Sequence, residues 1–341
     1  MSEPKTVWVN LDPRNVDLTP IVSRCEKAGY RCITKDIGTD TAKAVEMALQ
    51  ADAIVSIGEQ WNQDSLPQIA GSNRIIVRYG AGLDNVNVPL ATQYVIPVAN
   101  LPGMNSPAVA EIALLHILNL GRRFSYSIEG IKQGHWPYSM PGNELDGKVL
   151  GLIGFGNIAR QLTRMVQGFS LKIMAYDNYL NEAGRAFAQE HNVTLTQSAE
   201  EIYRNADIVS LHIPYTPANR GIVNKDCFAI MKPTAYLVNT CRGGVICEKD
   251  LIDALRTGQI RGAGLDVLCE EPPSMDNPLL HMDNVFVSSH LGSLAVEAEE
   301  RSQLLIADIS DEHFAGRIHR NVVNPQALAN HERNNCCATA K

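Results

Sequence analysis

The sequence has fewer positively charged than negatively charged residues. Its 30 Lys and Arg residues stand against 37 Asp and Glu residues, which gives a formal net charge of −7. Binding to a nucleic-acid backbone depends on clustered Lys and Arg, so this balance argues against nucleic acid as a partner. Disorder throughout the chain is excluded as well, because 45% of the residues are hydrophobic and only 20% are charged.

A membrane-spanning run is also missing. The most apolar stretch, residues 112–120, contains His116 and Asn119 and is much shorter than the ~20 residues of a transmembrane helix. The first residues lead directly into the strand-like Val7-Trp8-Val9, without the apolar core of a signal peptide. We therefore expect a cytoplasmic protein without a membrane partner.

Metal-ligand spacing is the third absence. The eight cysteines include no Cys-x-x-Cys pair and no zinc-ligand pattern. We therefore expect free thiols in a reducing compartment and no metal site. The cysteines are Cys25, Cys32, Cys227, Cys241, Cys247, Cys269, Cys336 and Cys337.

Short β-rich runs alternate with helical stretches along nearly the whole chain. Several of the runs are almost continuously apolar, as in parallel strands that are covered on both faces. The alternation predicts an α/β protein with doubly wound parallel sheets, and the length favours two domains. The strands are expected at residues 7–10, 53–57, 75–78, 95–98, 148–153, 172–177, 207–213, 235–240, 262–267 and 285–289.

Three helices have recognisable starts. Thr19 is expected to cap a helix that has Pro20 at its first position and ends at Gly29. Ser106 is expected to cap a long apolar helix that ends near residue 120, and a second helical segment follows at 124–134. Ser293 is expected to begin a further helix that ends near residue 314.

A glycine-rich turn follows the strand expected at residues 148–153. Gly154, Gly156 and Ala159 form the dinucleotide-binding pattern Gly-x-Gly-x-x-Ala, with Ala in the third place. Gly154 permits a tight turn, and Gly156 lets the backbone approach a pyrophosphate at the amino end of a helix. On its own, such a turn can also arise without any cofactor.

Asp177 supplies the context for this turn. It ends the next strand 21 residues after Gly156, close to the ~20-residue spacing of the acid that binds the cofactor ribose. A carboxylate there accepts hydrogen bonds from ribose hydroxyls and repels a 2′-phosphate, and no Arg or Lys follows before Arg185. The sequence therefore predicts NAD rather than NADP, the alternative being a solvated carboxylate at a strand end.

Polar residues follow three apolar strands in the C-terminal half, where ligand sites of open α/β sheets lie. Arg242 precedes two glycines, and its guanidinium can bind a carboxylate through two hydrogen bonds; a surface salt bridge is the alternative. His290 ends an apolar strand and is a candidate general acid or base; a structural histidine is the alternative. Glu270 and Glu271 precede two prolines, which by itself is typical of a solvated turn.

These motifs, in this order, resemble the D-isomer-specific 2-hydroxyacid dehydrogenase family. The resemblance runs from the first strand to about Pro325, and within the family the chain is similar to the phosphoglycerate dehydrogenase and hydroxypyruvate reductase type. We expect the short form of that type, without a C-terminal regulatory domain. Further matching segments are Arg78-Tyr-Gly80-Ala-Gly82-Leu-Asp84-Asn85, Asn105-Ser-Pro-Ala-Val-Ala-Glu111 and Leu211-His212-Ile-Pro214-Tyr-Thr216-Pro.

The resemblance implies roles for the matching residues. Arg242 would bind the carboxylate and carbonyl oxygen of a 2-oxo acid, His290 would protonate that oxygen, and Glu271 would hydrogen-bond His290. The implied substrate contacts are Arg78, Ala81, Gly82, Arg242 and His290. The implied cofactor contacts are Gly154, Gly156, Asn157, Ile158, Asp177, His212, Pro214, Thr240, Cys241, Arg242, Asp266, His290 and Gly292.

The resemblance also implies an architecture and a reaction. A Rossmann NAD-binding domain at residues 105–295 would be inserted into a flavodoxin-like substrate domain formed by residues 1–104 and 296–330, with a tail at 331–341. The expected reaction is the reversible, NAD-dependent reduction of a small 2-oxo acid to the (R)-2-hydroxy acid. Relatives are commonly homodimers, and residues 122–136 are the expected contact.

A second class of function stays open. NAD-sensing corepressors share this fold and keep the same Arg, Glu and His, so these three residues alone do not separate an enzyme from a binding protein. The acidic net charge of −7 favours the enzyme. Formate and phosphite are alternative substrates within the enzyme class, although a 2-oxo acid is favoured.

Overall fold

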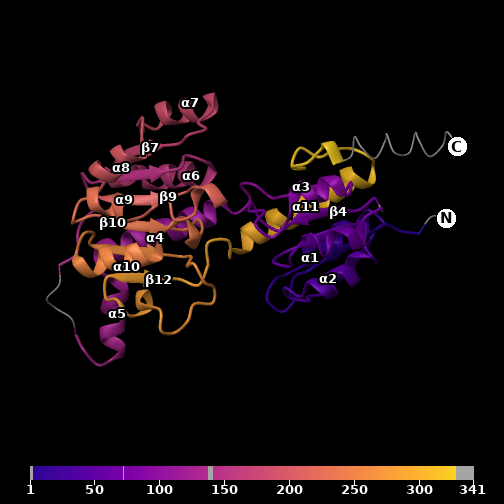
Figure 1. Ribbon diagram of the computed structural model, residues 1–341, viewed down its shortest axis with the longest axis horizontal. Coiled ribbons are helices and arrows are strands. Elements are labelled where there is room, and N and C mark those ends of the chain that lie inside the picture. The colour runs from indigo at the N-terminus through magenta and orange to yellow at the C-terminus, as the bar shows by residue number, and fades with distance from the viewer. Residues whose placement is uncertain (1–2, 72, 137–140, 328–341) are drawn as a thin grey trace. The chain divides into compact units, whose positions relative to one another are not determined.

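The computed structural model describes residues 3–71, 73–136 and 141–327, so the predicted tail at 331–341, with Cys336 and Cys337, lies outside the described residues. The chain divides into two compact units (Figure 1). The first comprises Met1–Asn105 and Ala295–Lys341, and the second comprises Ser106–Leu294. The chain therefore leaves the first unit once and returns to it.

The first unit contains a parallel sheet of five strands in the order β2-β1-β3-β4-β5. This is the flavodoxin-like order, in which the chain reverses direction across the sheet after its second strand. Its elements are β1 (Thr6–Val9), α1 (Thr19–Lys27), β2 (Arg31–Thr34), α2 (Thr41–Ala48), β3 (Ala53–Ser56), η1 (Leu66–Ile69), β4 (Ile75–Arg78), α3 (Val88–Gln93), β5 (Val98–Ala99) and α11 (Val296–Phe314).

The second unit contains a parallel sheet of seven strands in the order β12-β11-β10-β9-β6-β7-β8. This is the Rossmann order with one added strand, and the direction of winding changes between β6 and β9. Its elements are α4 (Ser106–Arg122), α5 (Phe124–Lys132), β6 (Val149–Ile153), α6 (Asn157–Met165), η2 (Val166–Phe169), β7 (Lys172–Tyr176), α7 (Glu182–Glu190), β8 (Thr194–Leu195), α8 (Ala199–Asn205), β9 (Ile208–Leu211), η3 (Pro217–Asn219), α9 (Lys225–Ile230), β10 (Tyr236–Asn239), η4 (Gly243–Val245), α10 (Glu248–Thr257), β11 (Gly262–Leu265), η5 (Pro278–His281) and β12 (Val285–Val287).

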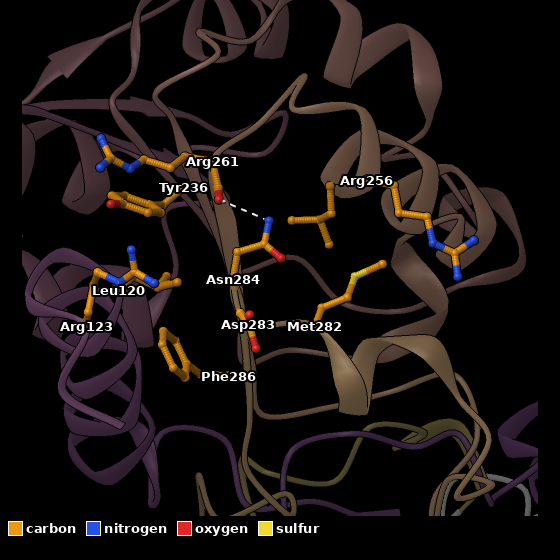
Figure 2. Close-up of a pocket in the computed structure, with 10 residues that line it drawn as sticks. Leu120, Arg123, Tyr236, Arg256, Arg261, Met282, Asp283, Asn284 and Phe286 are labelled. Carbon is orange, nitrogen blue, oxygen red and sulfur yellow. Dashed lines mark hydrogen bonds between the residues drawn. The ribbon is translucent and has the colours of Figure 1, made fainter. Parts of the chain in front are cut away.

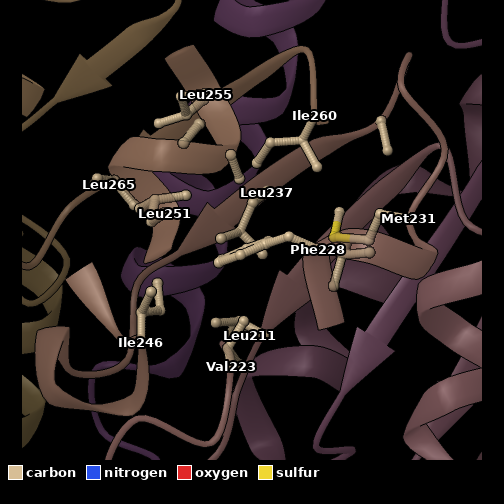
Figure 3. Close-up of a cluster of buried hydrophobic side chains, with 14 of the residues drawn as sticks. Leu211, Val223, Phe228, Met231, Leu237, Ile246, Leu251, Leu255, Ile260 and Leu265 are labelled. Carbon is tan, nitrogen blue, oxygen red and sulfur yellow. The ribbon is translucent and has the colours of Figure 1, made fainter. Parts of the chain in front are cut away.

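Both sheets are apolar on their two faces. In β1, Val7 and Val9 pack into one hydrophobic cluster and Trp8 into another, because successive side chains of a strand point to opposite faces. Figure 3 shows the corresponding cluster on one face of the second sheet, where Phe228 of α9 packs with Leu237 of β10. Full burial of each such side chain stabilises the fold by about 1.5–3 kcal/mol.

Two long helices cover these sheets. In the second unit, α4 packs against α6, β10 and β11. In the first unit, α11 packs against α1 and β4 (Figure 1). Gln303 of α11 secures this contact, since its amide group accepts a hydrogen bond from the Ile21 amide and donates one to the carbonyl oxygen of Asp17.

The predicted α/β class with two doubly wound parallel sheets is confirmed. Among the described residues, no helix combines the length with the apolar character that a membrane span requires. The cysteines in the same part of the chain are free thiols.

Three residues predicted to cap helices do not do so. Ser106 already lies inside α4, as its first residue. Thr19 is already inside α1, whose N-cap is Leu18, and its hydroxyl donates to the Asp17 carboxylate instead of capping the helix. Ser293 precedes the start of α11, whose N-cap is Ala295 without a side-chain hydrogen bond. None of the three is therefore the N-cap of its helix.

The strand expected at 95–98 was also misplaced. Val95 has a φ of 60° and belongs to the turn after α3, so the strand begins only at Val98. Two strands were missed altogether: β2, whose residues are exposed or half-buried at a sheet edge, and β8, which has two residues. Neither has the apolar run by which the other strands were predicted.

Candidate active site

A tight turn joins β6 to α6. Gly154 has a φ of 90°, and a Cβ built on it would lie 2.5 Å from the carbonyl oxygen of His212, so no larger residue fits. Gly156 is the N-cap of α6, and a Cβ built there meets no atom within 4 Å. The first N–H groups of the helix, at Asn157 and Ile158, have no acceptor within the helix. This open backbone fits the pyrophosphate of a dinucleotide.

Asp177 lies directly after β7 and is tied to the glycine turn. Its Oδ2 accepts a hydrogen bond of 2.7 Å from the Phe155 amide, and its Oδ1 accepts one of 2.8 Å from the Tyr179 amide. These bonds fix the orientation of the carboxylate. Because a carboxylate can accept about four hydrogen bonds, capacity remains for the hydroxyls of a ribose.

A cavity of about 700 Å³ opens beside this turn. It lies at the carboxyl ends of β6, β7 and β9, where the winding of the sheet changes direction and where open α/β sheets bind ligands. Its volume falls within the range of small-molecule and cofactor sites. The lining residues are Ile153, Gly154, Tyr176, Asp177, Asn178, Tyr179, Ala199, Glu200, Tyr203, His212, Ile213, Pro214, Thr216, Ala218, Asn219, Ile222, Asp226, Cys227 and Ile230.

His212 and Pro214 follow β9 and line the same cavity. Nε2 of His212 lies 2.9 Å from Oγ of Ser210. Burial lowers the pKa of His212 to about 4, so the ring is neutral at neutral pH. The cavity therefore gains a polar wall at this position without a positive charge.

The turn after β10 presents Arg242. Oδ1 of Asn239 accepts a hydrogen bond from the Cys241 amide, and Nδ2 of Asn239 donates one to the carbonyl oxygen of Arg242. Gly243 packs so closely against Leu268 that an added Cβ would lie 2.0 Å from the Leu268 carbonyl carbon. The backbone around Arg242 is therefore held on both sides.

Two neighbouring residues of this turn differ in their chemistry. Oγ1 of Thr240 is buried and has no hydrogen-bond partner within the described chain. An orphaned hydroxyl of this kind fits a site that receives a polar ligand. Burial raises the pKa of the Cys241 thiol to about 11, which keeps it protonated and excludes it as a nucleophile at neutral pH.

His290 and Glu271 form a hydrogen-bonded pair. Nδ1 of His290 lies 2.7 Å from Oε2 of Glu271, and the side chains are 44% and 38% exposed. Oε1 of Glu271 accepts a bond of 3.0 Å from the Leu268 amide, which fixes the carboxylate. An imidazole held at Nδ1 by a carboxylate is arranged to exchange a proton at Nε2.

The loop that carries His290 is bound to Asp266, which is 1% exposed. The carbonyl oxygen of Asp266 accepts from the His290 amide at 2.9 Å. Its carboxylate accepts from the amides of Leu291 and Gly292, both at 2.8 Å, and from the hydroxyl of Ser288. Asp266 and Gly292 are thus hydrogen-bonded to each other. Their contact with a cofactor stays a prediction.

The predicted substrate contacts of the first unit lie at the end of β4 and in the turn after it. Nε of Arg78 donates a bond of 3.2 Å to Oδ1 of Asn85. The carbonyl oxygen of Ala81 accepts from Nδ2 of Asn100 at 2.7 Å, and Gly82 follows as a half-buried residue. The turn is thus held by side-chain amides.

The structure brings the predicted residues of the second unit into two groups. Gly154, Asp177, His212 and Pro214 line one cavity. The residues 242, 266 and 290 follow β10, β11 and β12, which are neighbours in the sheet. Sequence reasoning missed His116 and Ser288, which support the second group; a lone His in an apolar helix and a Ser next to the His290 motif were the available signals.

A second hollow, of about 340 Å³, lies at the opposite edge of the same sheet (Figure 2). Tyr236, Arg261 and Asn284 stand at or just before the starts of β10, β11 and β12, so this hollow is at the amino ends of the strands. The glycine turn follows a carboxyl end. The hollow is therefore separate from the predicted cofactor site; its lining residues are Leu120, Arg123, Tyr236, Leu255, Arg256, Arg261, Met282, Asp283, Asn284 and Phe286.

Comparison with known families shows to which protein family the chain belongs. Residues 114–292 match the family model described as D-isomer specific 2-hydroxyacid dehydrogenase, NAD binding domain. The match covers more than half of the chain and includes both the glycine turn and His290. The chain belongs to this family. NAD is thereby confirmed as the cofactor class of the second unit.

Individual relatives agree with this assignment. The chain is 36% identical over 289 residues to D-3-phosphoglycerate dehydrogenase of Methanocaldococcus jannaschii. The alignment covers 84% of this chain and 54% of that protein, so this chain spans about half the length of that relative. It is 32% identical over 313 residues to glyoxylate reductase of Korarchaeum cryptofilum, covering 90% and 93% of the two chains. Apo D-lactate dehydrogenase from Escherichia coli shares the fold, with a TM-score of 0.80, 24% identity and coverage of 94% and 99%.

Proposed function

We propose that this chain catalyses the reversible, NAD-dependent reduction of a small 2-oxo acid to the (R)-2-hydroxy acid. The observation that carries the proposal is the 2.7 Å hydrogen bond between His290 and Glu271, in the unit that also contains the dinucleotide turn. The family match and the names of the relatives support the same class of reaction.

The proton transfer falls to His290. Because Nδ1 is engaged by Glu271, the proton that is exchanged with the substrate is held at Nε2. As negative charge develops on the carbonyl oxygen, His290 donates this proton to it, and the Glu271 carboxylate stabilises the imidazolium before transfer. General acid catalysis of this kind contributes a factor of about 10²–10⁴ to the rate.

Substrate binding falls to Arg242. Its guanidinium binds the substrate carboxylate and draws charge toward the carbonyl oxygen, and the fixed turn around it aligns the substrate. Arg78, Ala81 and Gly82 are proposed as further substrate contacts.

Cofactor binding falls to the glycine turn and its surroundings. Gly154, Gly156, Asn157 and Ile158 would hold the pyrophosphate, and Asp177 would bind the ribose and repel a 2′-phosphate. When bound, NADH supplies the hydride that adds to C2 of the substrate. His212, Pro214 and Thr240 to Arg242 are proposed to line the cofactor along the strand ends.

The test is steady-state NADH oxidation with a panel of 2-oxo acids that includes glyoxylate, hydroxypyruvate, pyruvate and a phosphorylated 2-oxo acid. We expect saturable turnover with at least one member and an (R) product. Tight NADH binding without turnover on any member would contradict the proposal and favour the alternative, an NAD(H)-sensing corepressor-like binding protein.

A homodimer is proposed as the working assembly. The α5 region carries exposed apolar side chains, with Phe124 59%, Ile131 49% and Trp136 66% exposed, as expected for the predicted contact at residues 122–136. Sedimentation equilibrium should give twice the mass of the chain, and a monomer at all concentrations would contradict the assembly.

The free thiols in the described part fit the proposed cytoplasmic location.

A further inference from the structure

A series of three side chains links α4 to the loop that carries His290. Nε2 of His116 lies 2.9 Å from Oγ of Ser288, and this hydroxyl donates to Oδ1 of Asp266 over 2.6 Å. His116 is 5% exposed and Asp266 is 1% exposed. Because His116 and Asp266 are buried, the hydrogen bonds that they make within the chain matter more than they would in water.

The protons in this series can be assigned from the Asp266 end. The amides of Leu291 and Gly292 donate to the Asp266 carboxylate, and the single hydroxyl proton of Ser288 is also directed to it. The hydroxyl oxygen can then only accept a hydrogen bond from His116, which must carry its proton on Nε2. Its Nδ1 is buried and has no partner among the described residues, which fits the unprotonated nitrogen of a neutral ring.

The surroundings of His116 fit a neutral imidazole. A Cβ built on Gly264 of β11 would lie 2.8–3.0 Å from three atoms of the His116 side chain, so the missing side chain at 264 makes room for the ring. Burial lowers the pKa of His116, and the charge of Asp266 opposes this only in part. The uncharged Ser288, which follows β12, also contacts the ring.

The loop beyond Ser288 needs such support. His290 adopts a φ of 56°, a left-handed conformation that is unfavourable for a residue with a side chain. The amides of residues 290, 291 and 292 donate hydrogen bonds to Asp266, and these bonds hold the backbone in this conformation. The position of the imidazole therefore depends on how Asp266 itself is held.

We propose that His116 is a positioning residue for His290. By donating to Ser288, His116 directs the hydroxyl proton toward Asp266 and keeps that carboxylate in place against the 290–292 loop. His116 thus acts through Ser288 and Asp266 and takes no part in proton transfer. The inference rests on the proposed function, because it assigns His290 as the acid or base to be positioned.

Paired substitutions test the donor. His116→Leu removes it, and we expect kcat to fall about 10- to 100-fold while the Kd for NADH is unchanged, because a small misplacement of an acid is costly. His116→Gln retains an N–H donor and should restore most of kcat. Ser288→Thr should likewise be more active than Ser288→Ala. Ile117→Val, next to His116 on α4 and buried, is the matched control and should leave kcat unchanged.

Histidine NMR provides a readout that needs no turnover. The His116 ring should show the Nε2–H tautomer and be neutral at neutral pH, and His116→Leu should alter the titration of the His290 ring. If the wild-type protein reduces no 2-oxo acid, the proposed function fails, and these signals still test the positioning. If His116→Leu turns over at the wild-type rate, if His116→Gln is no better than His116→Leu, or if the His290 titration is unaltered, the positioning proposal is overturned while the proposed function stands.

Discussion

At the scale of single residues, the proposed chemistry depends on His290. We expect His290→Ala to lower kcat by about 10²–10⁴-fold, because the developing charge on the carbonyl oxygen loses its proton donor. The Kd for NADH should change less than twofold, since His290 is proposed to act on the substrate. Stopped-flow and fluorescence titration measure the two quantities. His281→Ala, whose ring bonds the carbonyl oxygen of Met275, is the control, and equal loss of both quantities in His290→Ala would argue for a structural histidine.

Cofactor choice is a second property of one residue, Asp177. Replacement by Asn removes the charge and keeps an acceptor oxygen for one of the two amides that donate to Asp177. We expect Asp177→Asn to reduce the preference for NADH over NADPH at least tenfold in kcat/KM. Asp226→Asn removes another carboxylate that lines the same cavity and should leave the preference intact. If the preference survives in Asp177→Asn, another residue must set it.

His212 gives stability a pH dependence with a definite sign. Its pKa is about 4 in the folded chain, against 6.5 for an ordinary histidine, so between these values the unfolded chain binds more protons. Stability therefore falls as the pH is lowered from about 6.5 to 4. Between pH 7 and pH 5, this residue should account for a loss of about 2 kcal/mol.

Urea unfolding at pH 7 and pH 5 checks the His212 prediction. Wild type should lose about 2 kcal/mol more of its free energy of unfolding between these two pH values than His212→Gln does. Other titrating groups act on both proteins and cancel in the comparison. Equal losses in the two proteins would show that the His212 ring is not neutral in the folded chain.

At the scale of elements, the turn between β6 and α6 contains one glycine that the fold requires and one that we expect only NADH binding to require. Gly154→Ala places a methyl group against the His212 carbonyl oxygen at a φ of 90°, so we expect a loss of about 1–3 kcal/mol in stability together with loss of NADH binding. Gly156→Ala meets no protein atom and should fold normally, yet its methyl group should weaken NADH binding at least tenfold.

Thermal unfolding and NADH titration of both glycine variants check this prediction. The two variants are matched, since they make the same change two residues apart in one turn. Normal NADH binding by a folded Gly156→Ala protein would contradict the position assigned to the pyrophosphate.

Elements with an uninterrupted apolar run could be predicted from the sequence. β4 was predicted at its observed bounds, Ile75–Arg78, because all but its last residue are buried and apolar. β2 was not, because an edge strand with exposed Arg31 and Thr34 carries no such signal. The starts of α1 and α11 could not be predicted either, since the nearby Thr19 and Ser293 cap neither helix.

The residues of the candidate site also divide into those that local sequence motifs indicate and those that only the fold brings together. Gly154, Asp177 and His290 stand in motifs whose spacing along the chain indicates their proposed chemistry, so the sequence alone identifies them as candidates. The contact between His116 and Ser288 joins residues 172 positions apart, and the packing of α4 on the sheet creates it. No local pattern encodes such a pair.

At the scale of the whole molecule, the two strand orders reproduce a flavodoxin-like and a Rossmann sheet in one chain. The residues in the proposed motifs would act on the carboxylate, the carbonyl oxygen and C2 of a substrate. They do not determine which group is attached to C2, so the substrate panel is needed alongside the family assignment.

The central claim is hydride transfer to C2 with delivery of a proton to the carbonyl oxygen. Its most direct test uses NADH deuterated at the transferring position, with the best substrate of the panel, and NMR and chiral chromatography of the product. We predict one deuterium at C2 of the (R)-2-hydroxy acid in wild type, formed far more slowly by His290→Ala. A product without deuterium at C2, or an (S) product, would contradict the account.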